Sequence, residues 1–242
     1  MPRYFIEVSY KGTAYAGFQA QENANTIQAE VEKAFLVFFR EPCLLTGSSR
    51  TDAGVHALQN FFHADFIEIK EPENAAYHLN AILPADIVIE NILPVKSDAH
   101  CRFDAVSRTY EYSIYNHKNP FLSDRAYFFP FPLNLDLLGE AASIIREERN
   151  FEAFSKRNTQ VKTFECNIYE SEWLEREGRL VYQVTGNRFL RGMVRGLVGT
   201  MLRVGRGKTT VTRFKEIIAS RDHANADFSV PAHGLTLIKV SY

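Results

Sequence analysis

The segment 47–56 (GSSRTDAGVH) places one acidic and one basic side chain among small residues. Small neighbours let a backbone or a ligand approach closely. The carboxylate of Asp52 is therefore a candidate nucleophile, and the nearby Arg50 is a candidate for keeping it ionised. An aspartate before Ala-Gly is also typical of an Asx turn. On the pattern alone, this structural interpretation is favoured over the catalytic one.

A second candidate segment, 187–195 (NRFLRGMVR), carries two arginines at helical spacing. Arg191 and Arg195 are four residues apart, so they are expected on one helix face beside an apolar stripe. The forked guanidinium group suits carboxylate and phosphate, but surface arginines also lie along buried helices. Three glycines would weaken this helix, namely Gly192, Gly196 and Gly199. Their expected role is close packing against a sheet.

The strand predicted at 107–115 (SRTYEYSIY) is rich in tyrosine. Tyr110 and Tyr112 are expected to share one face of the strand, and Tyr115 to lie on the other. A strand tyrosine can stack on an RNA base. Packing within the protein is the alternative for each of them.

Markers of metal and cofactor chemistry are missing from the sequence. The seven histidines and three cysteines form no HExxH or CxxC motif, so neither a metal site nor a disulfide framework is predicted. Cys43, Cys101 and Cys166 are expected as reduced thiols in a cytoplasmic protein. Walker A, GxGxxG and GxSxG motifs are absent, so no nucleotide cofactor is predicted. We expect no secretory signal and no membrane span.

The charge of the chain is nearly balanced but unevenly distributed. Hydrophobic residues make up 45% and charged residues 24%, which excludes a disordered chain. The net charge is −1 overall, −6 over residues 1–105 and +5 over residues 106–242. Between residues 179 and 215 there are nine basic residues and no acidic one. Such a stretch suits a polyanion, because neutralised phosphates release counterions. A solvated basic face is the alternative.

Hydrophobic periodicity predicts strands and helices that mix without strict alternation, so the fold class is α+β. Strands are predicted at 3–10, 56–66, 86–92 and 107–115, in a hairpin around 177–178, and at the C-terminus. Helices are predicted from residue 27 after a cap at Asn25 or Thr26, at 74–82, around 138–145, from 190 to about Gly205, and at 213–220 after a Thr212 cap. Two halves are expected, 1–105 and 106–242.

Several of these segments together resemble the tRNA pseudouridine synthase A family. SSRTDAGVHALQN is similar to the active-site motif of that family, YKGTAYAGFQAQ to its first loop and TIQAEVEKAF to its first helix. Further similar segments follow in the family's order, namely NAILPADIVI, HCRFDAVSRTYEYSIY, NFEAF, NRFLRGMVRGLVGTML and PAHGLTLIKVSY. The resemblance covers essentially the whole chain.

The resemblance implies an isomerase that converts uridine to pseudouridine at positions 38, 39 and 40 in the anticodon stem-loop of tRNA. It implies no cofactor, no metal, and a homodimer in which both subunits contact each tRNA. It also implies a pseudouridine synthase fold, with an antiparallel-rich mixed sheet from two ferredoxin/RRM-like halves around a central basic cleft. The catalytic aspartate loop would lie in 1–105, and its tyrosine and arginine partners in 106–242.

The resemblance assigns roles to single residues. Asp52 falls on the catalytic aspartate, Arg195 on the arginine that pairs with it, and Tyr110 on the tyrosine that packs on the target base. Arg50 falls on an RNA-contacting arginine of the same motif. Further RNA contacts are expected at His100, Arg102, Phe103, Lys156, Arg157, Lys162, Arg188 and Arg191. Two positions depart from the family's pattern: Ser49 replaces the usual Gly before RTD, and Asn60 replaces the usual Gln.

The reaction implied breaks the N1–C1′ glycosidic bond, rotates the uracil and rejoins it through C5. A carboxylate can add to C1′, add to C6 or remove the C2′ proton, and the sequence leaves these routes open. Two other functions are alternatives. A non-catalytic RNA-binding protein would be indifferent to Asp52. A carboxylate glycosidase would need a second acid beside it, and Asp65 is merely nearby in the chain.

Overall fold

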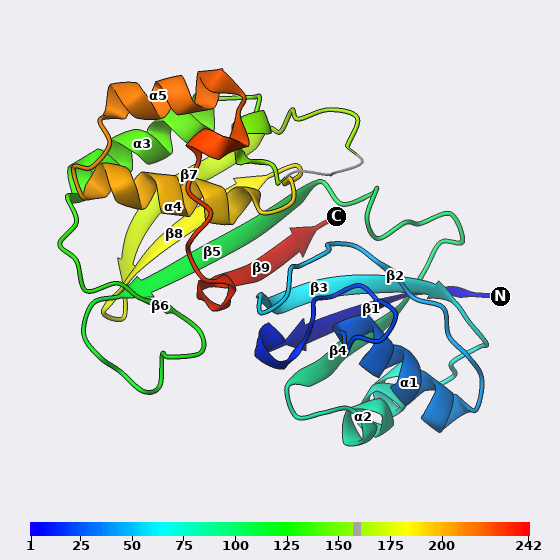
Figure 1. Cartoon of the computed structure of the whole chain (residues 1–242). Helices are drawn as coiled ribbons and strands as arrows, with labels where there is room; N and C mark the ends of the chain where they lie inside the picture. The colour runs from blue at the N-terminus through cyan, green and yellow to red at the C-terminus, as the bar shows by residue number, and fades with distance from the viewer. Residues whose placement is uncertain (157–160) are drawn as a thin grey trace. The chain divides into compact units, whose positions relative to one another are not determined.

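The structure, a computed structural model, describes residues 1–156 and 161–242. The chain forms two compact units (Figure 1). Unit 1 comprises Met1–Val106 and Leu237–Tyr242, and unit 2 comprises Ser107–Thr236. Both units combine helices with mainly antiparallel strands, which confirms the α+β prediction.

Unit 1 contains an antiparallel sheet in which β1 pairs with both β3 and β4. The strand order is β4-β1-β3-β9, and β2 also pairs with β3. The bounds are Arg3–Tyr10 for β1, Thr46–Gly47 for β2, His56–Asp65 for β3, Ile87–Val95 for β4 and Leu235–Ser241 for β9. Alternate residues of β1 are buried on one face, as the sequence RYFIEVSY predicts.

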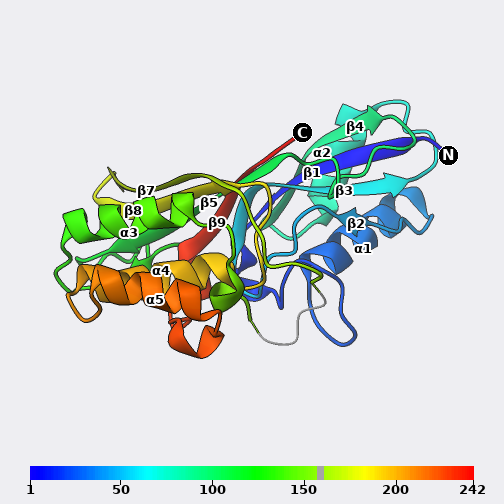
Figure 2. The same ribbon diagram turned by 90° about the horizontal axis from the view of Figure 1, so that it is seen from above.

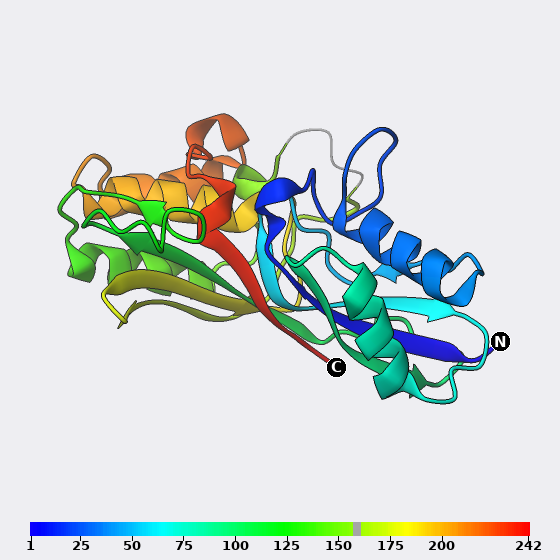
Figure 3. The same cartoon turned by 90° about the horizontal axis from the view of Figure 1, so that it is seen from below.

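Two helices lie side by side in unit 1 (Figure 3). They are α1 (Ile27–Phe39) and α2 (Pro72–Ile82). The N-terminus of α1 is capped by Thr26, whose hydroxyl accepts the N–H of Ala29 at 3.3 Å. The helix ends at Arg40, which is left-handed with a φ of 59°. The ring of Phe38 on α1 stacks on that of His78 on α2, with 5.2 Å between centroids.

The order β1-α1-β2-β3-α2-β4 of unit 1 is the strand–helix–strand–strand–helix–strand order of ferredoxin-like folds. Its sheet is lined by fully buried aromatic side chains. The rings of Phe18 and Phe62 stack with 4.4 Å between centroids. A Cβ on Gly47 would lie 2.4 Å from the Phe18 ring. The loop that follows β2 therefore begins in contact with the stacked rings of Phe18 and Phe62.

Apart from the short strand β6, unit 2 begins with the same order of strands and α-helices. Strand β5 pairs with β8 and β8 with β7, and the short β6 pairs with β5. The bounds are Ser107–Tyr115 for β5, Tyr127–Phe128 for β6, Ile168–Arg176 for β7 and Arg179–Gly186 for β8. The predicted hairpin is confirmed, because Glu177 and Gly178 join β7 to β8 with positive φ angles of 51° and 72°. Such a pair is typical of a tight hairpin turn.

The helices of unit 2 are α3 (Leu135–Glu147), α4 (Met193–Gly205) and α5 (Val211–Ser220). Figure 2 shows the three helices gathered together, and each packs against the other two. Helix α3 also contacts β7, and α4 contacts β5. Buried residues Leu138, Ala141, Ala142 and Ile145 form the apolar face of α3, as predicted.

Three details of the sequence prediction for unit 2 are wrong. Helix α4 begins at Met193, so Arg191 precedes it and does not share a helix face with Arg195. The cap of α5 is Thr210, whose hydroxyl accepts the N–H of Arg213, and not Thr212. The glycines of α4 do not approach a sheet. A Cβ on Gly199 would lie 2.2 Å from the carbonyl oxygen of Asp227.

All three cysteines are buried, and none of them forms a disulfide. Burial raises the pKa of the Cys43 thiol to about 12 and that of Cys166 to about 11. Across the described residues, no helix combines the length and the apolar character needed to cross a bilayer.

Candidate active site

Asp52 lies in the loop between β2 and β3, in a turn closed by the backbone. The N–H of Val55 donates to the carbonyl of Asp52 at 3.1 Å, and the N–H of Phe18 donates to that of Thr51 at 3.1 Å. An antiparallel bridge pairs Gly17 with Asp52. The main chain around Asp52 is therefore fixed, while the residue itself remains half-buried.

The segment after β1 lies directly against this turn. A Cβ on Gly12 would lie 2.0 Å from the carbonyl oxygen of Val55, so only glycine fits at this position. The N–H of Gly12 donates to Nδ1 of the buried His56 at 3.0 Å. The position of Asp52 thus depends on a loop that is distant in the sequence.

A buried network of hydrogen bonds holds the loop that carries Asp52 against strands β1 and β3. The hydroxyl groups of Tyr10 and Thr51 form a hydrogen bond of 2.8 Å. The Nδ2 group of Asn60 donates to the hydroxyl of Tyr10 at 3.1 Å and to the carbonyl of Ser49 at 2.9 Å. Asn60 is fully buried, so its two donations tie β1 and the loop to β3. Asn60, which departs from the family's pattern, therefore stabilises the loop that carries Asp52.

Ser49, the second departure, is also buried. Within the described part of the chain, the hydroxyl oxygens of Ser48 and Ser49 have no hydrogen-bond partner. An unpaired buried hydroxyl costs about 1–3 kcal/mol. The loop therefore has room for a side chain at position 49 but gains no bond from it.

Four of the predicted site residues line one pocket of about 260 Å³ in unit 1. They are Arg50, His100, Arg102 and Phe103. The Phe103 side chain is 74% exposed, and the guanidinium carbon of Arg102 lies 5.7 Å from its ring centroid. The ring centroid of His100 lies 4.2 Å from that of Phe103. An exposed aromatic ring beside two guanidinium groups suits an unstacked nucleotide.

Tyr110, on β5 of unit 2, is only 9% exposed. Its ring meets the edge of Phe189 at 5.1 Å between centroids. The aromatic neighbour belongs to the segment 187–195, so the structure joins two of the three segments that the sequence analysis singled out.

Arg195 lies in the first turn of α4 and is half-buried. Its Nε and Nη2 atoms donate to the carbonyl of Val230 at 2.9 and 2.6 Å. The hydroxyl of Tyr112 donates to the carbonyl of Pro231 at 2.8 Å, and burial raises the pKa of this hydroxyl. Two side chains therefore hold the segment 228–231. Arg195 belongs to unit 2 and Asp52 to unit 1, and their pairing stays a prediction.

The remaining predicted RNA contacts belong to unit 2. The N–H of Lys156 donates to the carbonyl of Arg191 at 3.0 Å, so these two residues lie together. Arg188 is half-buried, and Lys162 is exposed. Arg157 lies outside the described residues.

Sequence reasoning missed the residues that hold the Asp52 loop. Gly12, Tyr10 and Asn60 carry no reactive group at the surface, and no motif spacing links them to Asp52. One signal was available: a glycine two residues after a predicted strand, where the chain must turn. This signal indicates a close contact without naming the partner.

The chain is similar to tRNA pseudouridine synthases over its whole length. The family model described as tRNA pseudouridine synthase matches residues 6–104 and 148–242. A protein named tRNA pseudouridine synthase A from Porphyromonas gingivalis is 44% identical over 247 aligned residues, which cover 100% of this chain and 98% of the relative. Proteins of the same name from Azobacteroides pseudotrichonymphae and Staphylococcus aureus are 41% and 36% identical, over 100% and 98% of this chain and 97% and 90% of the relatives.

The mainly antiparallel α+β fold and these similarities define an enzyme of the isomerase class. The chain belongs to the tRNA pseudouridine synthase family.

Proposed function

We propose that this enzyme converts uridine to pseudouridine at positions 38, 39 and 40 in the anticodon stem-loop of tRNA, with Asp52 as its nucleophile. The observation that carries the proposal is the Asp52 turn. Backbone hydrogen bonds at Thr51 and Val55 fix the main chain, while Asp52 remains half-buried. A nucleophile must be held in position without being covered.

The pocket in unit 1 supports RNA as the substrate. Arg50 and Arg102 supply positive charge, and the exposed Phe103 ring offers a stacking surface for a base. A target base inside a stem or loop stack must be flipped out, which costs a few kcal/mol. Phosphate contacts by the basic stretch 179–215 offset that cost. The resemblance to the family implies no metal or nucleotide cofactor, which agrees with an isomerisation that involves no net oxidation or hydrolysis.

In the proposed mechanism, Asp52 reacts at C1′, at C6 or at the C2′ proton, and the N1–C1′ bond breaks. The uracil then rotates and a C5–C1′ bond forms, while the bond to Asp52 breaks or, in the third route, the C2′ proton is returned. The proton on C5 is lost, and N1 takes up a proton. Arg195 keeps Asp52 ionised. Tyr110 packs on the ring and is the candidate base for the C5 proton.

The test uses an unmodified tRNA transcript that carries uridines at positions 38, 39 and 40, without added metal or nucleotide. Pseudouridine is mapped by carbodiimide treatment and primer extension. Wild-type protein is expected to produce stops at these positions, and Asp52→Asn is expected to produce none while still binding tRNA. Asn has nearly the same volume as Asp, so the fold is retained.

Asp65→Asn is the matched control. Asp65 accepts hydrogen bonds from Arg3 at 2.8 and 2.7 Å, at an exposed position of unit 1. It is expected to retain full activity. Turnover by Asp52→Asn would refute the assignment of the nucleophile. Tight tRNA binding by the wild type without any stops would favour a non-catalytic RNA-binding protein.

We also propose that the enzyme acts in the cytoplasm as a homodimer, as the resemblance of its sequence to the family implies. Light scattering of the purified chain tests the dimer, and a monomeric mass at micromolar concentration would contradict it.

A further inference from the structure

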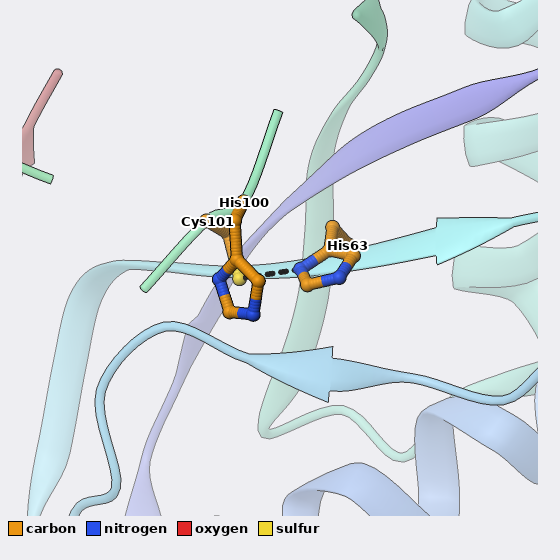
Figure 4. Close-up of side chains that lie close together, drawn as sticks. All are labelled: His63, His100 and Cys101. Atoms are coloured by element: carbon orange, nitrogen blue, oxygen red, sulfur yellow. Dashed lines mark hydrogen bonds between the residues drawn. The ribbon is translucent and has the colours of Figure 1, made fainter. Parts of the chain in front are cut away.

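Three side chains with metal-binding atoms come together in unit 1. They are His63 on β3 and the consecutive residues His100 and Cys101, which follow β4 in the chain (Figure 4). One ligand atom from each lies within 4.8 Å of the others. The Nδ1 atom of His63 lies 3.1 Å from the sulfur of Cys101, and the two imidazole centroids are 4.5 Å apart.

The cluster is held in place from several directions. Cys101 is fully buried, and its carbonyl accepts the hydroxyl of Tyr242 at 2.7 Å. The N–H of His100 donates to the carboxylate of Asp104 at 2.7 Å. His63 is 7% exposed and belongs to the middle of the sheet, whereas His100 is half-buried. The three ligand atoms therefore meet at a site that is closed on one side and accessible on the other.

We propose that His63, His100 and Cys101 form a binding site for Zn²⁺ or a similar divalent metal ion, with two imidazole nitrogens and one thiolate as ligands. Zinc prefers nitrogen and sulfur ligands at about 2.0–2.3 Å in tetrahedral geometry, which separates neighbouring ligand atoms by about 3.3–3.6 Å. The observed separations, from 3.1 Å to at most 4.8 Å, bracket this range. Small side-chain rotations bring the three atoms to it.

Binding requires one balanced exchange of bonds. The thiol of Cys101 lies 3.1 Å from the carbonyl of Thr46 and donates its proton to it. The metal takes the thiolate and an unprotonated nitrogen of His63, so the hydrogen bonds of the sulfur to Thr46 and to His63 are both lost. Metal–sulfur and metal–nitrogen bonds form in their place, and the thiol proton is released to solvent. Two imidazoles and one thiolate leave a fourth position for water.

The simpler interpretation is a hydrogen-bonded pair in which His63 donates to the sulfur of Cys101. Serine at position 101 would preserve such a pair but removes the thiolate ligand. A hydrogen-bonded pair predicts no saturable Co²⁺ binding by the wild type or by Cys101→Ser, whereas a metal site predicts binding by the wild type with a thiolate signal that Cys101→Ser abolishes.

The site adjoins the pocket of unit 1, because His100 and Thr46 also line that pocket. A bound ion would hold the segment 100–103, which carries Arg102 and Phe103, in one position. This consequence rests on the proposed RNA contacts, whereas metal binding itself does not.

The test is a titration of chelator-treated full-length protein with Co²⁺, followed by competition with Zn²⁺, in the absence of RNA. Wild-type protein is expected to bind one Co²⁺ per chain and to show thiolate-to-cobalt charge-transfer absorption. Cys101→Ser should abolish that absorption. His100→Gln removes a half-buried ligand. Loss of a residue that only hydrogen-bonds a metal ligand weakens metal binding by about 10–100-fold, so loss of a ligand should weaken it by at least about tenfold.

Cys43→Ser is the matched control, since Cys43 is a second buried thiol in unit 1. It should bind Co²⁺ as the wild type does. Zn²⁺ should raise the midpoint of thermal unfolding of the wild type and of Cys43→Ser, but not that of Cys101→Ser. Absorption that survives Cys101→Ser, or that disappears with Cys43→Ser, would overturn the proposal. So would a wild-type titration without saturable binding. Loss of pseudouridine formation in Asp52→Asn leaves every one of these outcomes unchanged.

Discussion

Apart from the short strand β6, units 1 and 2 begin with the same order of strands and α-helices, but they hold their proposed catalytic side chains differently. In unit 1 the backbone fixes Asp52, through hydrogen bonds at Thr51 and Val55 and a bridge to Gly17. In unit 2 the side chain of Arg195 is itself fixed, because its guanidinium group donates two hydrogen bonds to the carbonyl of Val230. A carboxylate held by its main chain keeps its oxygen atoms available for chemistry. An arginine that uses two N–H groups for these bonds still has further N–H groups that can donate to another partner.

Both units use a glycine at the point of closest approach. Gly12 faces the carbonyl of Val55, and Gly199 faces that of Asp227. The difference is where the glycine lies: Gly12 begins a short 3₁₀ helix after β1, and Gly199 is in the middle of α4. At both positions a Cβ would meet a backbone carbonyl, so the main chain itself would have to move.

The largest effects are expected from an added methyl group at these two positions. Gly12→Ala and Gly199→Ala each lower the free energy of unfolding by about 1–3 kcal/mol, as overpacking does. Gly12→Ala also displaces the turn that closes at Val55. A shift of about 1 Å at a catalytic group costs about 100-fold in rate. Urea unfolding and single-turnover pseudouridine formation measure the two effects.

Gly139→Ala is the control for this pair. Gly139 lies in α3, and a Cβ there meets nothing within 4 Å. Alanine at this helical position is expected to stabilise the protein by up to about 1 kcal/mol and to leave the rate unchanged. Wild-type stability and rate in Gly12→Ala would mean that the loop adapts and that the backbone does not fix Asp52.

Elements with strong local signals were predictable from the sequence. The alternating pattern of 3–10 and the polar side chain of Thr26 specify a strand and a helix cap locally, and both predictions are confirmed. The cap of α5 was misplaced because two threonines stand two residues apart, and local propensity does not distinguish them. The start of α4 at Met193 was missed because Leu190 continues the apolar spacing across a turn.

The residues of the candidate site were predictable only where they lie close together in the sequence and form a motif. Asp52 and Arg50 stand together in the chain, so their pattern is visible. His63 and Cys101 come from separate elements, and only the pairing of strands brings them to 3.1 Å. The same is true of Asn60 and Tyr10, whose contact depends on the register of β1 with β3. Spacing rules for metal or polar networks do not detect such pairs.

An intermediate effect is expected from Asn60→Ala. The change removes one hydrogen bond from the hydroxyl of Tyr10, which keeps its bond to Thr51, and one from the carbonyl of Ser49. The loss costs about 2 kcal/mol. The loop before Asp52 then loses its support, so the rate at saturating tRNA should fall together with stability. Thermal unfolding and single-turnover kinetics are the measurements.

Asn80→Ala is the matched variant. The side chain of Asn80 forms two hydrogen bonds, with the N–H and the carbonyl of Ile89, and it lies on α2. It should lose similar stability and keep its rate. Equal losses of rate in both variants would show that general destabilisation, and not support of the Asp52 loop, limits the activity.

The smallest effect is expected from Arg195→Lys, which keeps the charge but removes the fork. A lysine reaches the carbonyl of Val230 with one donor at most, so the free energy of unfolding should fall by about 1 kcal/mol. The segment 228–231 should then exchange its amide hydrogens faster, and the rate of pseudouridine formation should fall. Arg203→Lys, at an exposed position of the same helix, should change neither property. Unchanged amide exchange at 228–231 in Arg195→Lys would show that the Arg195 fork is not needed to hold this segment. The proposed catalytic side chain of unit 2 would then, like that of unit 1, not be fixed by its own hydrogen bonds.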